Sequence, residues 1–287
     1  MKQMASMCLM LVLAFPAAIF SQGWPEDSGS YFLKASQSWT IYNQFFQEDG
    51  RKVNVDRTRS FGISSIYGQY GLTDRLTFKA YVPFFVKSTV FARQNAFSGQ
   101  LLQAGEKNTG LGDLTTSLQY AIKLNQIILS AALILGIPTG EYDLNDTQNP
   151  TGDGEFNQQV NLGVAGSFLI GGIYPFSSLF VGYNNRTNGF SDEWHAAFKL
   201  GTNWNRVLVV SELYTIQSFF NGEFNEVLVY GGGIVGNNAE MVTLNLQFAY
   251  RVYDELYFSF QLSRPLAGRY YFADNLYEVG IFIKGGN

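Results

Sequence analysis

The sequence predicts an all-β fold, a transmembrane antiparallel up-and-down β-barrel of twelve strands. Many short segments alternate between apolar and polar residues, which is typical of a strand with one apolar and one polar face. Aromatic residues make up 16% of the chain and charged residues only 15%, so many rings must lie on the surface. No run after residue 23 reaches the roughly 18 apolar residues that a membrane helix needs. A closed barrel is the remaining way to satisfy the backbone in lipid.

The N-terminal residues have the pattern of a secretory signal peptide. Lys2 precedes the apolar run "MCLMLVLAFPAAIF", and the small residues Ser21 and Gly23 come before Trp24. We therefore expect residues 1–23 to be removed and residues 24–287 to form one barrel domain, with 24–30 as a short periplasmic lead-in. Cys8, the single cysteine of the sequence, lies in the removed part. The mature chain then has neither a disulfide nor a cysteine metal site.

The strands are predicted from rows of alternating residues. Val160, Leu162 and Val164 form an apolar row expected to face lipid, and the row from Leu76 to Val86 does the same in an earlier segment. Each row fits the ~9–11 tilted residues of a membrane strand. The predicted strands span residues 31–45, 57–70, 75–86, 111–122, 126–137, 156–170, 175–185, 193–202, 206–218, 239–251, 255–264 and 275–284.

The connections alternate in length, as they do in outer-membrane barrels. Short turns read "GLTDR", "KLNQ", "GGIYP", "NWNR" and "RVYDE" and are assigned to the periplasmic side. Longer segments at 46–57, 87–110, 138–155, 186–193, 219–238 and 265–274 are assigned to the outside. The segment 226–236 is kept in a loop, because an extra single strand would make the number odd. Fourteen strands remain an alternative, with the added strand drawn from 87–108.

The charge balance and the fold class together suggest where the chain resides. Nineteen Lys and Arg against 23 Asp and Glu give a net charge of −4, and this mild acidity argues against a nucleic-acid partner. We expect the protein in the bacterial outer membrane, with membrane lipid, lipopolysaccharide, the barrel-assembly machinery and a small solute as partners. No cofactor is expected, and the sequence does not indicate an oligomeric state.

Charged residues in the polar rows are the candidate functional residues. They are expected to point into the lumen, where charges must be hydrated or paired. Two interpretations stay open: an ionic network that plugs and stiffens the barrel, or a polar constriction on a solute path. The residues are Lys34, Lys79, Asp113, Lys199, Glu212 and Glu278, with Lys284 near the C-terminus.

For two further features, a structural interpretation is favoured over a catalytic or metal-binding one. His195 is the single histidine and is expected to face inward, because Trp194, Ala196 and Phe198 have the lipid-facing pattern. It lacks the serine two residues later that outer-membrane phospholipases of similar strand number carry, so we expect no catalytic site and no enzyme. The acidic residues between 141 and 155 do not match the helix-loop-helix calcium pattern, and a solvated loop is favoured over a bridging calcium site.

Two stretches resemble a known family. The residues "GLGDLTTSLQY" followed by "AALILGIPTGEYD" are similar to the outer-membrane family associated with meta-pathway phenol degradation, whose barrels are related to fatty-acid and aromatic-hydrocarbon transporters. "YGLTDRLTFKAYVPFF" is similar to a periplasmic turn and strand of such proteins. The final "KGGN" departs from the usual aromatic C-terminus, so the row Tyr277, Val279, Ile281 and Ile283 is the expected assembly signal. The motif residues are Gly110, Gly112, Asp113, Pro138 and Gly140.

The resemblance implies a channel or transporter that passes small solutes, hydrophobic or aromatic ones among them. The alternative is a barrel that transports nothing and has a structural or external-binding role, with its lumen plugged. In that case the segment 87–110, which carries Phe91, Phe97 and Leu101, could act as an inward plug or lid.

Overall fold

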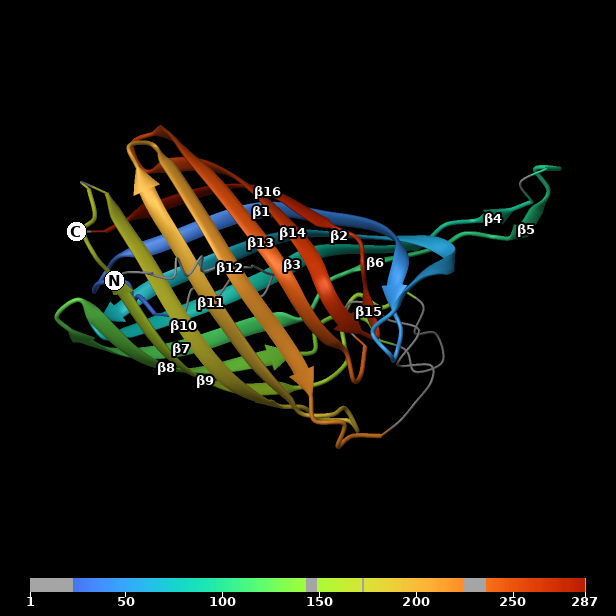
Figure 1. The fold of residues 1–287 in the computed structure, drawn as a ribbon, viewed down its shortest axis with the longest axis horizontal. Coiled ribbons are helices and arrows are strands. Elements are labelled where there is room, and N and C mark those ends of the chain that lie inside the picture. Colours follow the sequence, from blue (N-terminus) through green and yellow to red (C-terminus); the bar gives the residue numbers. More distant parts are fainter. Residues whose placement is uncertain (1–22, 96, 143–148, 172, 224–235, 287) are drawn as a thin grey trace, which may run out of the picture.

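The computed structural model describes residues 23–95, 97–142, 149–171, 173–223 and 236–286. Twelve long strands pair antiparallel in chain order, and the sheet closes because β1 pairs with both β2 and β16 (Figure 1). This confirms the predicted twelve-strand barrel. The strands are β1 (Tyr31–Phe46), β2 (Lys52–Thr73), β3 (Leu76–Val90), β7 (Leu114–Leu124), β8 (Ile127–Ile137), β9 (Asn157–Ser167), β10 (Tyr174–Asn185), β11 (Glu193–Trp204), β12 (Val207–Ser218), β13 (Glu240–Tyr253), β14 (Leu256–Arg269) and β16 (Leu276–Gly285). No helix in the described ranges is long and apolar enough to span a membrane.

The predicted rows face the way the alternation indicates. Val160, Leu162 and Val164 on β9 are exposed on the outer surface, whereas Asn161 between them is buried. The same contrast separates Leu246 and Phe248 from Asn245 on β13. The barrel thus exposes apolar side chains outward and gathers polar ones inside, which is the arrangement for lipid outside and a polar interior.

One residue of a predicted lipid-facing row is reversed. Val86 has only 1% of its surface exposed, although the alternation from Leu76 puts it outside. The register between β2 and β3 shifts between Ser64 and Ile66, where β3 contributes the additional residue at Pro83 and Phe84. Such a bulge turns the following side chains to the other face, and proline is tolerated there because it has no N–H for the ladder.

Three of the tight turns are two residues long and have an Asn or Asp in the left-handed backbone region. Asn125, Asn205 and Asp254 have φ values of 54°, 55° and 34°, in the region where Asn and Asp are enriched. They join β7 to β8, β11 to β12 and β13 to β14. The predicted turn after β9 is longer, because the strand ends at Ser167 and only an isolated bridge joins Ile170 to Ile173.

The segment 87–110 is a hairpin that extends the barrel wall outward. β3 continues to Val90 and pairs with β6 (Glu106–Gly110). Beyond them β4 (Arg93–Gln94) pairs with β5 (Leu101–Gln103), and this tip projects past the end of the barrel (Figure 1). Phe97 at the tip is fully exposed. The segment therefore does not fold inward as a plug in this structure, and it adds no membrane-crossing strand.

Candidate functional site: the barrel interior

Most of the predicted lumen charges lie inside the barrel in pairs. Lys34 on β1 forms an ion pair with Glu278 on β16, and Lys199 on β11 lies 2.8 Å from Glu212 on β12. Lys79 on β3 is buried, with 1% of its surface exposed. Lys284 differs, since it is exposed at the C-terminal end with its Nζ 5.6 Å from the Tyr257 ring.

The lead-in segment occupies the periplasmic part of the interior. Trp24 packs against the inner-wall residues Ala121, Ile128 and Ala165. Its ring and the Phe176 ring are in a T-shaped arrangement, with their centroids 5.5 Å apart. The backbone N–H of Glu26 donates to the Thr77 hydroxyl at 2.9 Å. Burial raises the pKa of Glu26, an effect that the neighbouring Lys79 and Lys284 charges oppose. Residues expected to be a simple lead-in thus fill part of the lumen.

A cavity of about 400 Å³ lies inside the barrel toward the end with the long loops. One part of its lining is apolar or aromatic and comes mainly from β10, β12, β13, β15 (Tyr271–Phe272) and β16. These side chains are Phe180, Tyr214, Met241, Tyr271, Phe272 and Leu276, which also pack together as one buried cluster. The other part carries amides and carboxylates from β9, β10, β11 and the loops before them. The cavity is therefore amphipathic.

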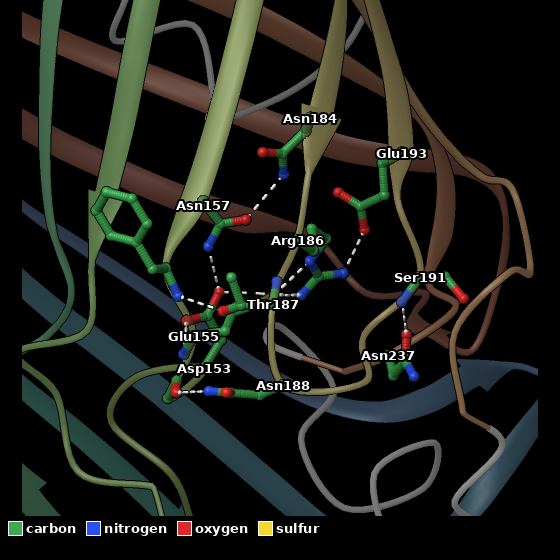
Figure 2. A network of polar contacts seen from close by, with 12 residues as sticks. Asp153, Glu155, Asn157, Asn184, Arg186, Thr187, Asn188, Ser191, Glu193 and Asn237 are labelled. Carbon is green, nitrogen blue, oxygen red and sulfur yellow. Dashed lines mark hydrogen bonds and ion pairs between the residues drawn. The ribbon is translucent and has the colours of Figure 1, made fainter.

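Arg186 organises the polar wall from the residue after the end of β10. Its guanidinium is ion-paired with Glu155 and with Glu193 and lies 3.9 Å from Asp153 (Figure 2). It also stacks 4.6 Å from the Phe190 ring centre. Glu155 is fully buried. Burial raises the pKa of Glu155 to about 8, although the Arg186 charge acts in the opposite direction. Sequence reasoning did not find this cluster, because its members are scattered over three loop-strand junctions.

The family-motif residues interlock at the rim. The N–H of Gly112 donates to the Pro83 carbonyl at 2.8 Å, and the Thr139 hydroxyl donates to the Gly112 carbonyl at 2.6 Å. A Cβ on Gly112 would come within 2.7 Å of Pro83, so only glycine fits. Gly110 ends β6, and Pro138 directly follows β8. The two stretches that carry the resemblance thus bind each other at the ends of neighbouring strands.

The Asp113 carboxylate adds two hydrogen bonds to these contacts. It accepts hydrogen bonds from the N–H groups of Gly140 at 2.9 Å and Asp153 at 2.6 Å. Burial, followed by the Asp153 charge, raises the pKa of Asp113 to about 6. The residue lines the cavity rim. Unlike Lys34 and Lys199, it has no ion pair among the described residues.

His195 faces inward, as the alternation predicted. It is buried, and its neighbour Trp194 is exposed. Its ring nitrogens lie 2.6 Å from the Tyr214 hydroxyl and 3.1 Å from the Glu193 carboxylate. These partners fix the ring against the cavity, and neither is a serine or a thiol.

The acidic loop 141–155 is only partly described. Glu141 accepts a hydrogen bond from the Asn108 amide at 3.2 Å, and residues 143–148, which include Asp143 and Asp146, lie outside the described residues. Within the described ranges no three His, Cys, Asp or Glu side chains converge closely enough to hold a metal ion.

Comparison with known proteins bears on the fold. No family model and no curated protein matches the chain. An outer-membrane channel from Pseudomonas putida F1 is similar in structure, with 18% identity, a TM-score of 0.61, and coverage of 92% of this chain and 98% of that one. The translocator domain of the autotransporter NalP from Neisseria meningitidis has 9% identity, a TM-score of 0.52, and coverage of 93% and 92%. The chain thus has the fold of an outer-membrane β-barrel.

Proposed function

We propose that this barrel is a channel of the bacterial outer membrane that passes small solutes, hydrophobic or aromatic ones among them. The observation that carries the proposal is the interior cavity of about 400 Å³ with its aromatic and aliphatic wall. Binding sites for small molecules are typically concave and mostly apolar, with a few placed polar groups. A barrel of twelve strands is also wider than the eight-strand barrels whose side chains fill the interior.

The interior charges would control what passes. Asp113 lies before β7, at the outer rim of the cavity. Lys34 with Glu278 and Lys199 with Glu212 form buried ion pairs in the interior, and Lys79 adds charge on β3. Together they would form a polar constriction. A solute leaving the cavity toward the periplasm would then meet Trp24, so passage requires the lead-in segment to move.

The alternative is a plugged barrel with a structural or external-binding role. It is favoured by the same residue, because Trp24 fills space among Ala121, Ile128 and Ala165. The distant likeness to phenol-pathway barrels stays an expectation, as do contacts with lipopolysaccharide and with the barrel-assembly machinery. His195 is taken to have no catalytic role, since its partners orient it without supplying a nucleophile.

Planar-bilayer recordings of the purified, folded protein would separate the two functions. The channel predicts measurable conductance that rises in Trp24→Ala, because the indole no longer fills the lumen. Trp204→Ala is the matched control, since that ring is 73% exposed at a turn and its loss should leave conductance unchanged. If neither the wild type nor Trp24→Ala conducts at any voltage, the plugged barrel is the correct function. Liposome uptake of small aromatic solutes tests the hydrophobic class.

A further inference from the structure

The cavity lining carries more carboxylates than basic side chains. Its lining includes Asp113, Asp153, Glu193 and Glu278 against Arg186 and His195. Glu278 is neutralised by Lys34, and Glu193 by Arg186. The remaining two carboxylates lie at the rim nearest the long loops.

Neither rim carboxylate has a cation to itself, although Asp153 accepts hydrogen bonds from the Glu155 N–H at 3.1 Å and from the Asn157 amide at 2.9 Å. Arg186 is 3.9 Å from Asp153 and is already shared with Glu155 and Glu193. Asp113 is held by two backbone N–H groups, and its pKa is raised to about 6 by burial and by the Asp153 charge. Carboxylates that crowd in this way gain from a nearby positive charge. Within the described ranges no three ligating side chains converge as a metal site would require.

An independent sign of a guest comes from Asn184 on the same wall. The residue is 4% exposed, and its amide nitrogen donates to the Asn157 oxygen at 2.8 Å. Its own Oδ1 has no hydrogen-bond partner among the described residues (Figure 2). A buried acceptor without a partner is costly, and a guest that carries N–H donors would satisfy it. The Nδ2 of Asn161 is likewise unused and would suit an acceptor on the same guest.

The aromatic part of the lining fits an apolar body. Phe180, Tyr214 and Phe272 present rings to the cavity, and aromatic faces attract ammonium groups as well as apolar surface. A neutral hydrocarbon would leave the rim carboxylates and the Asn184 oxygen desolvated. A carboxylate guest would be repelled by them.

We propose that the cavity is a binding site for small organic ammonium ions, with the charged nitrogen toward Asp113, Asp153 and Asn184 and the apolar body on the aromatic wall. The proposal deepens the channel function and rests on it for transport, because the solute that passes would then be an organic cation. Binding itself can be measured without transport.

Three probes of nearly equal shape provide the test: benzylammonium, benzyl alcohol and benzoate. Calorimetric titration of the folded protein in detergent should give at least about tenfold tighter binding of benzylammonium than of benzyl alcohol, as expected for one additional charge contact in a partly dry site. Benzoate should bind more weakly than the alcohol. Equal binding of the three, or the tightest binding for benzoate, would overturn the proposal.

Variants tie the preference to the rim. Asp153→Asn and the double variant Asp113→Asn with Asp153→Asn should each lose most of the preference for benzylammonium. Asp56→Asn removes an exposed carboxylate away from this cavity and should retain it. Should the double variant fail to fold, Asp153→Asn alone decides, and an unchanged preference there contradicts the proposal. Conductance recordings with the same three probes separate the two proposals. If benzylammonium binds but the protein does not conduct, the channel function is contradicted. If the protein conducts but does not prefer benzylammonium over the other two probes, the cation site is contradicted.

Discussion

Leu118 on β7 lies directly opposite Leu133 on β8, and both side chains point outward. They are 44% and 47% exposed, while the adjacent Ser117 and Ala132 are 4% and 6% exposed. This pair fixes the register of the two strands. A shift by one residue would exchange the lipid-facing and inward-facing sets.

Arginine at either leucine should destabilise the barrel strongly. Leu118→Arg or Leu133→Arg places a charge in the middle of the lipid-facing surface, which costs ~2–4 kcal/mol near the bilayer midplane. The measurement is urea unfolding in lipid vesicles.

The matched control is Thr115→Arg on the same strand, which lines the cavity and should fold nearly normally. Ser117 and Ala132 are less suitable for arginine because they are small and tightly enclosed. A stable Leu118→Arg protein together with an unfolded Thr115→Arg protein would mean that the faces are reversed.

Replacing one partner of an interior ion pair should lower the stability of the barrel more than replacing both partners. Lys199 and Glu212 have side chains only 12% and 3% exposed, so Glu212→Gln leaves a buried ammonium without its partner, at ~3–5 kcal/mol. The double variant Lys199→Met with Glu212→Gln should recover most of this loss.

An exposed pair provides the comparison for that cycle. Arg93 and Asp56 are 3.2 Å apart with side chains 49% and 66% exposed, and Arg93→Met should cost ~0–1 kcal/mol. If Glu212→Gln costs no more than Arg93→Met, water in the lumen hydrates the charges and the interior pairs do not stabilise the barrel.

The sequence predicts the wall of the barrel far better than its contents. Alternation with period two depends on nearest neighbours along the strand, so the outward rows of β9 and β13 can be read directly. The alternation puts Val86 on the wrong face, because a bulge at Pro83 shifts the alternation by one residue without breaking the apolar pattern.

The site depends on contacts that no local pattern reveals. Lys34 and Glu278 are 244 residues apart and meet only because β1 and β16 close the barrel. Arg186, Glu155 and Glu193 come from separate junctions, and Trp24 from a segment before the first strand. Pairing of charges across a barrel could have been anticipated from the inward rows, but their partners could not.

The hairpin beyond β3 and β6 should not act as a lid. Its tip lies past the end of the barrel (Figure 1), and Phe97, Leu101 and Leu102 are exposed there. Replacing residues 92–104 by a short glycine-serine linker should leave single-channel conductance unchanged while the protein folds normally. A rise in conductance after this deletion would show that the tip blocks the entrance in the membrane.

Stability should fall as the pH rises from 6 to 8 because of Glu155. Burial raises the pKa of Glu155 to about 8, from 4.5 for the unperturbed group, so the folded protein keeps a proton that the unfolded chain has already released. Stability from this proton is full below pH ~4.5 and is lost as the pH rises through 8. Asp113 acts in the same direction, but its raised pKa of about 6 puts most of its effect below this window.

The temperature at which the folded band on an unboiled gel disappears, measured from pH 6 to 8, reports this loss. Glu155→Gln mimics the protonated side chain and should flatten the slope over this range, with a transition at pH 6 close to that of the wild type. Glu141→Gln is the control, since this acid is at the same end of the barrel but is exposed, and it should keep the wild-type slope. A Glu155→Gln transition lowered equally at every pH, with the slope intact, would mean instead that Glu155 stays ionised against Arg186 throughout.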